Sequence, residues 1–274
     1  RGTRHVAPTG AGQLLLRTAA PLLVQLDTTV QQLRRQRQRQ PVGLTTFASF
    51  ASLWLLPRLA GFQERHPGVD IRISANDRIA EFDDPELDLA LRYCLPADAP
   101  PGSVRLFGEL LTPVASPALL ARQPIRRATD LARHVLLEED DGRPSARYLS
   151  WRHWLQQHAP SVAEPRAWIY LNYTYQQIQA ALAGQGVALA RVALVAEALA
   201  RRELVEPLGE AGRLRPPFAY WLVRWPDRDG RPGVAAVDAW LLEQAAATRA
   251  ALGEAPEDDP VTTATPAARA RAMR

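Results

Sequence analysis

Residues 42–74 read VGLTTFASFASLWLLPRLAGFQERHPGVDIRIS, and this stretch decides the fold. Its first residues, Val42–Thr45, predict a short strand, and residues 50–66 predict a helix with one apolar side. Pro57 removes a helical hydrogen bond, so we expect the helix to bend there. Residues 69–74 alternate between apolar and polar side chains, which indicates a half-buried strand. This strand–helix–strand order predicts the α/β class, with a mostly parallel sheet and helices on its faces.

The same alternation of strand and helix patterns continues toward the end of the chain. Further strands are predicted at residues 87–91, 112–115, 135–137, 167–171, 187–189, 204–205 and 218–224. Longer helices are predicted at residues 151–158, 173–183, 192–200 and 234–252. Two such series predict two lobes with a cleft between them. Residues 253–274 are rich in Pro, Ala, Thr and charge and show no periodicity, so we expect a disordered tail.

A long helix is predicted before the first strand, at residues 9–40, with Thr9 as its N-cap and Pro41 as its stop. Pro21 is expected to kink it. Apolar residues spaced three and four apart form a stripe typical of dimerising coiled coils. The residues of this heptad stripe are Leu15, Ala19, Leu22, Leu26, Val30 and Leu33. An ordinary amphipathic helix packed on its own domain is the alternative.

Composition excludes several kinds of enzyme. The chain has 274 residues, and all 33 basic side chains are arginine, so the lysine-dependent phosphate-binding loop, kinase site and pyridoxal phosphate site are absent. The single cysteine, Cys94, excludes a disulfide framework and a multi-cysteine zinc site. The turn Gly184-Gln185-Gly186 approaches a dinucleotide-binding motif without completing it. We therefore expect no enzyme, and no catalytic residues, metal or cofactor.

Hydropathy and charge indicate where the protein works. No apolar run reaches the roughly 18 residues that span a bilayer, and the first residues lack a signal-peptide pattern, so we expect a cytoplasmic protein without membrane contact. The net charge is +4, and residues 1–40 contain one acid, Asp27, beside a run of arginines at 34, 35, 37 and 39. Such a run either contacts nucleic acid phosphates or is a solvated helix face.

Several segments occur together in the order found in one protein family. They are Ser49–Ala51, Trp54–Leu59, His66–Pro67, Asp88–Tyr93, Ser116–Leu120, Gln179–Leu189 and Phe218–Tyr220. The ordered set resembles the LysR-type transcriptional regulators, in particular the group of glycine-cleavage activators and β-lactamase regulators. The resemblance extends over most of residues 9–247.

The resemblance implies a two-lobed effector domain like that of periplasmic binding proteins, with Rossmann-like lobes, preceded by a long linker helix. The implied parts are residues 9–40 as dimerisation helix, 41–109 plus 219–252 as lobe I, and 110–218 as lobe II. Residues 1–8 resemble the end of the family's winged helix-turn-helix, whose remainder is absent from this sequence. In an intact protein, the resemblance therefore places Arg1 and Arg4 near the phosphate backbone or the minor groove of DNA, although a frayed basic terminus is the alternative.

The implied function is a transcriptional regulator that binds double-stranded DNA as a homodimer or homotetramer. A small-molecule effector in the cleft between the lobes would control transcription by binding two states of the protein unequally. A solute-binding module of periplasmic type, without DNA-binding activity, shares the architecture and is the alternative.

Two corners of the expected cleft are candidates for holding the effector. Helix N-termini at the carboxyl ends of strands present free amides, which can clamp a carboxylate or a small polar molecule. The candidates in the first corner are Thr46, Ser49 and Phe50. Those in the second are Asn172, Tyr173 and Thr174. Ser49 and Asn172 could instead simply cap their own helices.

Four more residues follow strand ends and complete the candidate set. Asn76 and Asp77 line the cleft or form a turn. Arg92 is a partner for an acidic effector or half of an internal ion pair with a carboxylate such as Asp88. Tyr93 is a wall of the cleft or a member of the core.

Overall fold

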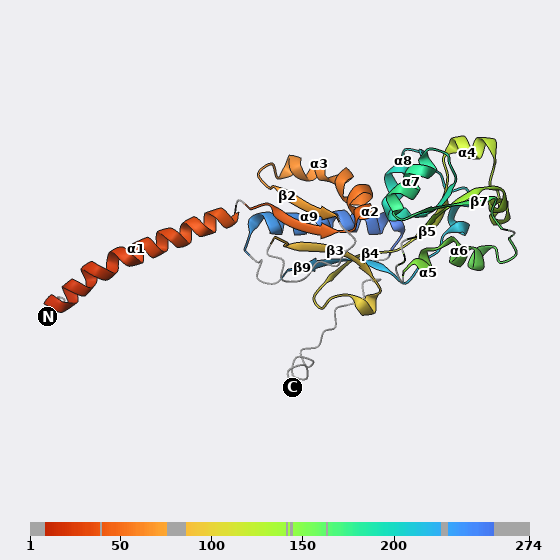
Figure 1. Ribbon diagram of the computed structural model, residues 1–274. Coiled ribbons are helices and arrows are strands. Elements are labelled where there is room, and N and C mark those ends of the chain that lie inside the picture. Colours follow the sequence, from red (N-terminus) through yellow and green to blue (C-terminus); the bar gives the residue numbers. More distant parts are fainter. Residues whose placement is uncertain are drawn as a thin grey trace, which may run out of the picture.

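The computed structural model places two sheets side by side, with one long helix extending from them (Figure 1). The residues that it describes are 9–38, 40–75, 86–140, 142, 145–162, 164–225 and 230–254. The expected wing segment 1–8, with Arg1 and Arg4, lies outside this part of the chain, as do Asn76 and Asp77.

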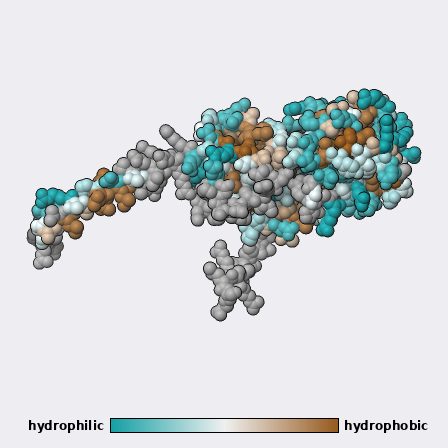
Figure 2. Space-filling view, viewed as in Figure 1, coloured by the Kyte–Doolittle hydropathy of each residue, from teal (hydrophilic) through white to brown (hydrophobic). Residues whose placement is uncertain are grey.

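Helix α1 (Gly10–Gln38) is the predicted long helix. Thr9 caps it, since its Oγ1 accepts a hydrogen bond from the backbone N–H of Gly12 at 3.2 Å. The helix continues through Pro21 without interruption. It extends away from both sheets in Figure 1, and apolar atoms lie along its surface in Figure 2. Among the residues of the heptad stripe, Leu15, Leu22 and Leu26 are 70%, 62% and 61% exposed. Ala19 is half-buried, and the side chains of Val30 and Leu33 lie outside the description.

Lobe I is built on a five-stranded sheet with the order β2-β1-β3-β9-β4. Its strands are β1 (Val42–Thr46), β2 (Ile71–Ala75), β3 (Leu89–Cys94), β4 (Val104–Gly108) and β9 (Ala219–Arg224). Strand β1 is parallel to β2 and β3, whereas β9 returns antiparallel between β3 and β4. The sequence patterns did not predict β4, which follows a short segment rich in Pro and Gly.

The helices of lobe I are α2 (Ala48–Phe50), α3 (Leu56–Arg65) and α9 (Pro232–Leu252). The bend predicted at Pro57 takes the form of a π-helical segment, Ala51–Leu55, that lies directly before α3. A proline clashes with the carbonyl four residues earlier, and a wider π turn accommodates that clash. The indole N–H of Trp54 in this segment donates to Thr248 Oγ1 of α9 at 3.0 Å, which joins the helices across the core.

Lobe II is built on a four-stranded sheet with the order β5-β8-β6-β7. Its strands are β5 (Leu111–Val114), β6 (Val135–Glu139), β7 (Ala167–Leu171) and β8 (Val187–Arg191). Strand β6 is parallel to β7 and β8, and β5 is antiparallel to β8. The predicted strand at residues 204–205 is only a bridge between Val205 and Ala115.

Five α-helices surround this sheet, and three short 3-10 turns complete the described chain. The helices are α4 (Pro117–Arg122), α5 (Ala146–Leu149), α6 (Trp151–His158), α7 (Thr174–Leu182) and α8 (Val192–Ala200). The 3-10 turns are Pro96–Asp98, Ala128–Arg133 and Gly209–Gly212. Helices α6 and α7 cover opposite faces, because Trp154 packs with Leu136 of β6 whereas Ile178 packs with the next residue, Leu137.

A buried ion pair fixes the junction between the long helix and lobe I. The Arg231 guanidinium donates to both carboxylate oxygens of Asp88, at 2.7 and 2.8 Å, and to the carbonyl of Gln40 at 2.6 Å. Asp88 also accepts from the backbone N–H of Gly43 at 2.9 Å. The alternative of an Arg92–Asp88 ion pair is therefore wrong, because Arg231 occupies that carboxylate.

The carboxyl end of α9 corrects the expected start of the tail. Gly253 ends the helix with a φ of +67°, a conformation that favours glycine. The Glu254 carboxylate accepts from the backbone N–H of Gly108 at 2.7 Å and pairs with Arg105 at 2.9 Å. Residues 253 and 254 therefore belong to lobe I.

Candidate functional site

The two predicted corners meet directly at the contact between the lobes, which we call the seam. Ser49, in α2 of lobe I, is 4% exposed. Its Oγ accepts a hydrogen bond from the backbone N–H of Tyr175, in the first turn of α7 in lobe II, at 3.2 Å. Ser49 therefore satisfies a free amide of the other lobe's helix instead of capping its own helix. An amide of this kind is a natural anion-binding position.

A cluster of buried charges lies along the same seam. Arg191 ends β8, Glu139 ends β6, and Glu109 lies between β4 and β5, where the chain passes from one sheet to the other. The Arg191 guanidinium lies 3.3 Å from the Glu139 carboxylate and 3.9 Å from that of Glu109. The Arg191 and Glu109 side chains are buried, and that of Glu139 is 9% exposed. Thr174 Oγ1 donates to Glu139 at 2.8 Å, so the first turn of α7 is tied to this cluster.

Aromatic rings of lobe I surround the Arg191 guanidinium. Its central carbon lies 4.7 Å from the ring centroid of Tyr93 and 5.8 Å from that of Phe47, which places the cation over both rings. The hydroxyl of Tyr220 donates to Glu109 at 2.8 Å. Arg191 of lobe II thus lies against aromatic rings and a carboxylate of lobe I.

Burial controls the protonation of this cluster. It raises the pKa of Glu109 above its ordinary value, although Arg191 and the Tyr220 hydroxyl act in the opposite direction. Burial alone lowers the pKa of Arg191, but the Glu139 carboxylate and its neighbours raise it well above the ordinary value. The arginine therefore stays charged, and Glu109 takes up a proton more readily than an exposed glutamate does.

The remaining candidates have different surroundings. Thr46 is buried at the end of β1, and its hydroxyl has no hydrogen-bond partner among the described residues. Phe50 is fully buried in the lobe I core, where it stacks on Trp54 at 4.7 Å between ring centroids. Tyr93 belongs both to the core and to the wall of the seam.

The second corner is only partly brought into the seam. Thr174 binds Glu139, and Tyr173 stacks on Tyr175 with 5.4 Å between ring centroids. Asn172 is exposed, and its side chain makes no hydrogen bond to a described residue. It does not cap α7, whose N-cap is Tyr173, so Thr174 and the Tyr175 amide, rather than Asn172, are the polar groups of this corner that contact the seam.

Arg92 lies elsewhere. Strand β3 alternates its faces, and Arg92 shares a face with Ala90 rather than with Tyr93. Its register partner in β9 is Trp221, and its guanidinium donates to its neighbour's carbonyl, Leu91 O, at 3.4 Å. Burial lowers the pKa of Arg92. The structure does not bring this residue to the Ser49–Tyr175 contact.

Sequence reasoning missed the three charges at the centre of the seam. The strand and helix patterns predicted at residues 187–189 and 192–200 leave Arg191 unassigned, and none of the three residues is among the predicted site residues. One signal was available, because Arg191 is the only charged residue between Val187 and Val195. A charge within such an apolar run is buried unless the chain turns, and a buried charge requires partners.

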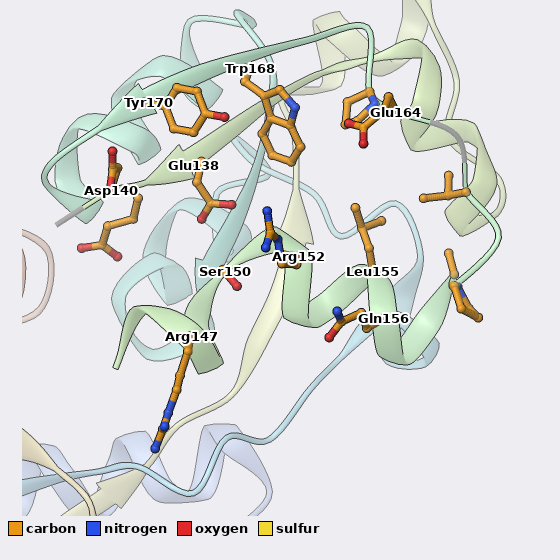
Figure 3. Close-up of a pocket in the computed structure, with 15 residues that line it drawn as sticks. Glu138, Asp140, Arg147, Ser150, Arg152, Leu155, Gln156, Glu164, Trp168 and Tyr170 are labelled. Atoms are coloured by element: carbon orange, nitrogen blue, oxygen red, sulfur yellow. The ribbon is translucent and has the colours of Figure 1, made fainter. Parts of the chain in front are cut away.

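An open groove adjoins the seam in lobe II and encloses about 650 Å³ (Figure 3). It lies between α6 and the edge strand β7, with Trp168 and Tyr170 on one side and Arg152 and Leu155 on the other. Glu138 projects into it, whereas the next residue, Glu139, reaches the seam. Burial raises the pKa of Glu138 from 4.5 to about 7, although the backbone N–H of Trp151 donates to it at 3.0 Å.

Two other kinds of feature are absent from the described part of the chain. No group of three His, Cys, Asp or Glu side chains there could hold a metal ion. No helix in that part is both long and apolar enough to span a membrane.

Comparison with known proteins places the chain in a family. Residues 35–246 match the family model described as the LysR substrate binding domain. The chain is 30% identical over 256 residues to the glycine cleavage system transcriptional activator of Escherichia coli K12, a match that covers 90% of this chain and 79% of the relative.

Solved structures agree with this match. The effector domain of the transcriptional regulator AmpR of Pseudomonas aeruginosa superimposes with a TM-score of 0.60 at 30% identity, over 78% of this chain and all of that domain (100%). CrgA, a LysR-type transcriptional regulator from Neisseria meningitidis, shares the fold with a TM-score of 0.58 at 19% identity, over 89% of this chain and 82% of CrgA. The chain therefore belongs to the LysR-type transcriptional regulators, and its two lobes form the effector-binding domain of that family.

Proposed function

We propose that the seam is the effector site and that its contacts couple effector binding to the arrangement of the lobes. The hydrogen bond from Tyr175 N–H to Ser49 Oγ carries this proposal, because it joins the first turn of α7 in lobe II to lobe I. An effector that binds this amide must replace Ser49 as its partner. Binding and lobe geometry then change together, which is the requirement for a ligand to shift a conformational equilibrium.

The chemistry of the seam favours a small polar effector with a carboxylate. The contacts of Arg191 to Glu139 and Glu109, 3.3 and 3.9 Å, are longer than those of a well-formed guanidinium–carboxylate pair. A carboxylate between the lobes could pair with Arg191 in two-point geometry and accept from the α7 amides. Thr45 and Thr46 end the neighbouring strand. Their hydroxyls have no hydrogen-bond partner among the described residues and could bind a second polar group.

A ligand screen tests this assignment. We expect one or more small carboxylates to raise the unfolding temperature of the chain and to lose that effect in Ser49→Ala and Arg191→Gln. Glu243→Gln, which removes an exposed pairing with Arg65, is a matched control and should retain the response. A carboxylate that stabilises all four proteins equally would contradict the seam as the site.

We propose further that the protein is a dimeric cytoplasmic regulator without enzymatic activity, which binds DNA through a winged helix-turn-helix outside the present sequence. Membership of the family supports DNA binding, and the exposed leucines of α1 support dimerisation through this helix. No observation favours a solute-binding module. The DNA-binding part is tested by a gel shift with the complete reading frame and its own upstream region, where absence of retardation would contradict it.

Sedimentation of the chain tests dimerisation separately. Leu22→Asp combined with Leu26→Asp places two charges on the heptad stripe of α1 and should convert a dimer into a monomer. Arg17→Asp, on the opposite side of the same helix, should leave the dimer intact. A dimer that survives the double substitution would show that another surface holds the two copies together, or that tetramers form without this helix.

A further inference from the structure

A second hollow lies at the end of the lobe II sheet that is farthest from the seam. It encloses about 560 Å³ and is lined, among others, by Arg122, His134, Arg166 and Gly186. His134, Arg166 and Gly186 directly precede β6, β7 and β8. Glu139 and Arg191 of the seam lie at the other ends of β6 and β8. Because these strands are parallel, the two sites occupy opposite ends of one sheet.

The lining of this hollow is basic and contains no carboxylate. Arg122 ends α4, and Arg166 lies directly before β7. Both side chains are exposed, and neither pairs with a carboxylate of the described residues. The nearby acid Asp130 is already used, since it accepts from the backbone N–H groups of Arg126 and Arg127 and pairs with Arg133.

His134 adds a polar group that has no partner. Its side chain is 1% exposed, and neither ring nitrogen has a hydrogen-bond partner among the described residues. Buried polar groups are almost always paired, so an unpaired imidazole that lines a hollow indicates that something else can occupy it. Burial, assisted by the Arg133 charge, lowers the pKa of His134, so the ring is neutral near pH 7 and can donate one hydrogen bond.

The turn Gly184-Gln185-Gly186 gives the hollow its shape. A Cβ on Gly186 would lie 2.6 Å from the carbonyl oxygen of Val135, so only glycine allows the turn to lie against the start of β6. Gly184 has a φ of +71°, and a Cβ there would lie 3.6 Å from Nη2 of Arg122. The glycines that seemed to approach a nucleotide-binding motif therefore hold one wall of the hollow close to the Arg122 guanidinium.

We propose that this hollow binds a phosphate group, held by the guanidinium groups of Arg122 and Arg166 and by a ring nitrogen of His134. Guanidinium forks match the oxygens of phosphate in two-point geometry, and an imidazole N–H supplies a further donor. A site without carboxylates does not repel the dianion. The phosphate can be free or part of a small phosphorylated metabolite, and this site is independent of the effector proposed at the seam.

Titration of the full chain with inorganic phosphate tests the proposal, with calorimetry for affinity and NMR for the His134 ring signals. We expect saturable binding that shifts the His134 signals. Arg122→Gln combined with Arg166→Gln should weaken the affinity at least ten-fold. Arg17→Gln combined with Arg126→Gln removes the same charge outside the hollow and should bind phosphate like the parent chain.

Three results would overturn the proposal: no saturable binding, equal affinity in the Arg122→Gln, Arg166→Gln variant, or the same His134 shifts with chloride at matched ionic strength. A parallel titration with glycerol phosphate separates the two sources. Binding of both compounds supports a phosphorylated metabolite, and binding of inorganic phosphate alone supports the free ion.

Discussion

Two buried arginines of this protein are held in opposite ways. Arg231 lies within lobe I and donates to both oxygens of Asp88, at 2.7 and 2.8 Å, and to the carbonyl of Gln40. Arg191 lies between the lobes, 3.3 and 3.9 Å from the carboxylates of Glu139 and Glu109, with its cation over the Tyr93 ring. The first arginine has short, directed contacts, whereas the second has longer contacts to several partners.

The difference separates a structural charge from one that can change partners. A buried charge whose hydrogen bonds are short and directed has no better arrangement available, so Arg231 fixes the junction between α1 and lobe I. Arg191 loses less favourable interaction energy when one carboxylate moves away, because another carboxylate and an aromatic ring remain beside it. A contact between lobes that must rearrange on binding is expected to have this second character.

The largest expected effect comes from the structural pair. Arg231→Gln leaves Asp88 buried without a cation and should lower the free energy of unfolding by about 3–5 kcal/mol, as when one partner of a buried pair is removed. Urea unfolding measures this loss. Arg224→Gln, which breaks an exposed pair with Asp238, should cost less than about 1 kcal/mol. Equal losses in the two variants would remove the distinction between the two buried arginines.

A smaller loss is expected at the seam. Arg191→Gln should lower the free energy of unfolding by about 2–3 kcal/mol at pH 7, because a charged group loses its partner but Glu109 can take up a proton. Without Arg191, the already raised pKa of Glu109 rises further. The folded state then holds this proton more tightly than the unfolded chain, so the defect should grow as the pH rises from 5 to 8.

Unfolding at several pH values measures this change. If the Arg191→Gln variant is equally destabilised at pH 5 and at pH 8, the pKa of Glu109 does not respond to the loss of the Arg191 charge. The two arginines would then have the same character.

The groove beside the seam predicts a pH effect of its own. The pKa of Glu138 is raised from 4.5 to about 7, so its contribution to stability is complete below pH 4.5 and is lost as the pH rises through 7. After allowance for its partial exposure, this loss is about 1–2 kcal/mol. Glu138→Gln should flatten the pH dependence of unfolding between 5 and 8. Glu164→Gln, on the exposed rim of the same groove, should leave that pH dependence unchanged. If the free energy of unfolding changes equally with pH in both variants, this account is contradicted.

The smallest expected effect is at Ser49. Ser49→Ala removes the acceptor for the Tyr175 amide and should cost about 1 kcal/mol, the usual value of a helix cap. Its effect on shape should exceed its effect on stability, since this bond joins the lobes. Small-angle scattering should therefore show a more open average shape than for Ser52→Ala, an exposed serine three residues further on. Identical scattering profiles would show that other contacts keep the lobes closed.

Local patterns were sufficient for much of the fold. Alternation predicted β2 and β3, and the predicted limits of α6 and α8 agree with the structure. Strand β4 was missed since its short apolar run, Val104–Gly108, shows no alternation that continues beyond it. At the site, Ser49 and Thr174 were found because helix starts are visible in a sequence. Asn172 was chosen by the same reasoning and lies exposed.

The sequence by itself determined the α/β class, the two lobes, the long α1 helix and the family, because each depends on periodicity or on short ordered motifs. Only the tertiary structure decided which partner each charged residue has. Asp88 pairs with Arg231, 143 positions away, and Ser49 caps a helix 126 positions away. Such pairs leave no periodic signal, since the carboxylate or hydroxyl and its partner are brought together by the packing of elements that are remote in the chain. The seam and the basic hollow are therefore properties of the folded molecule.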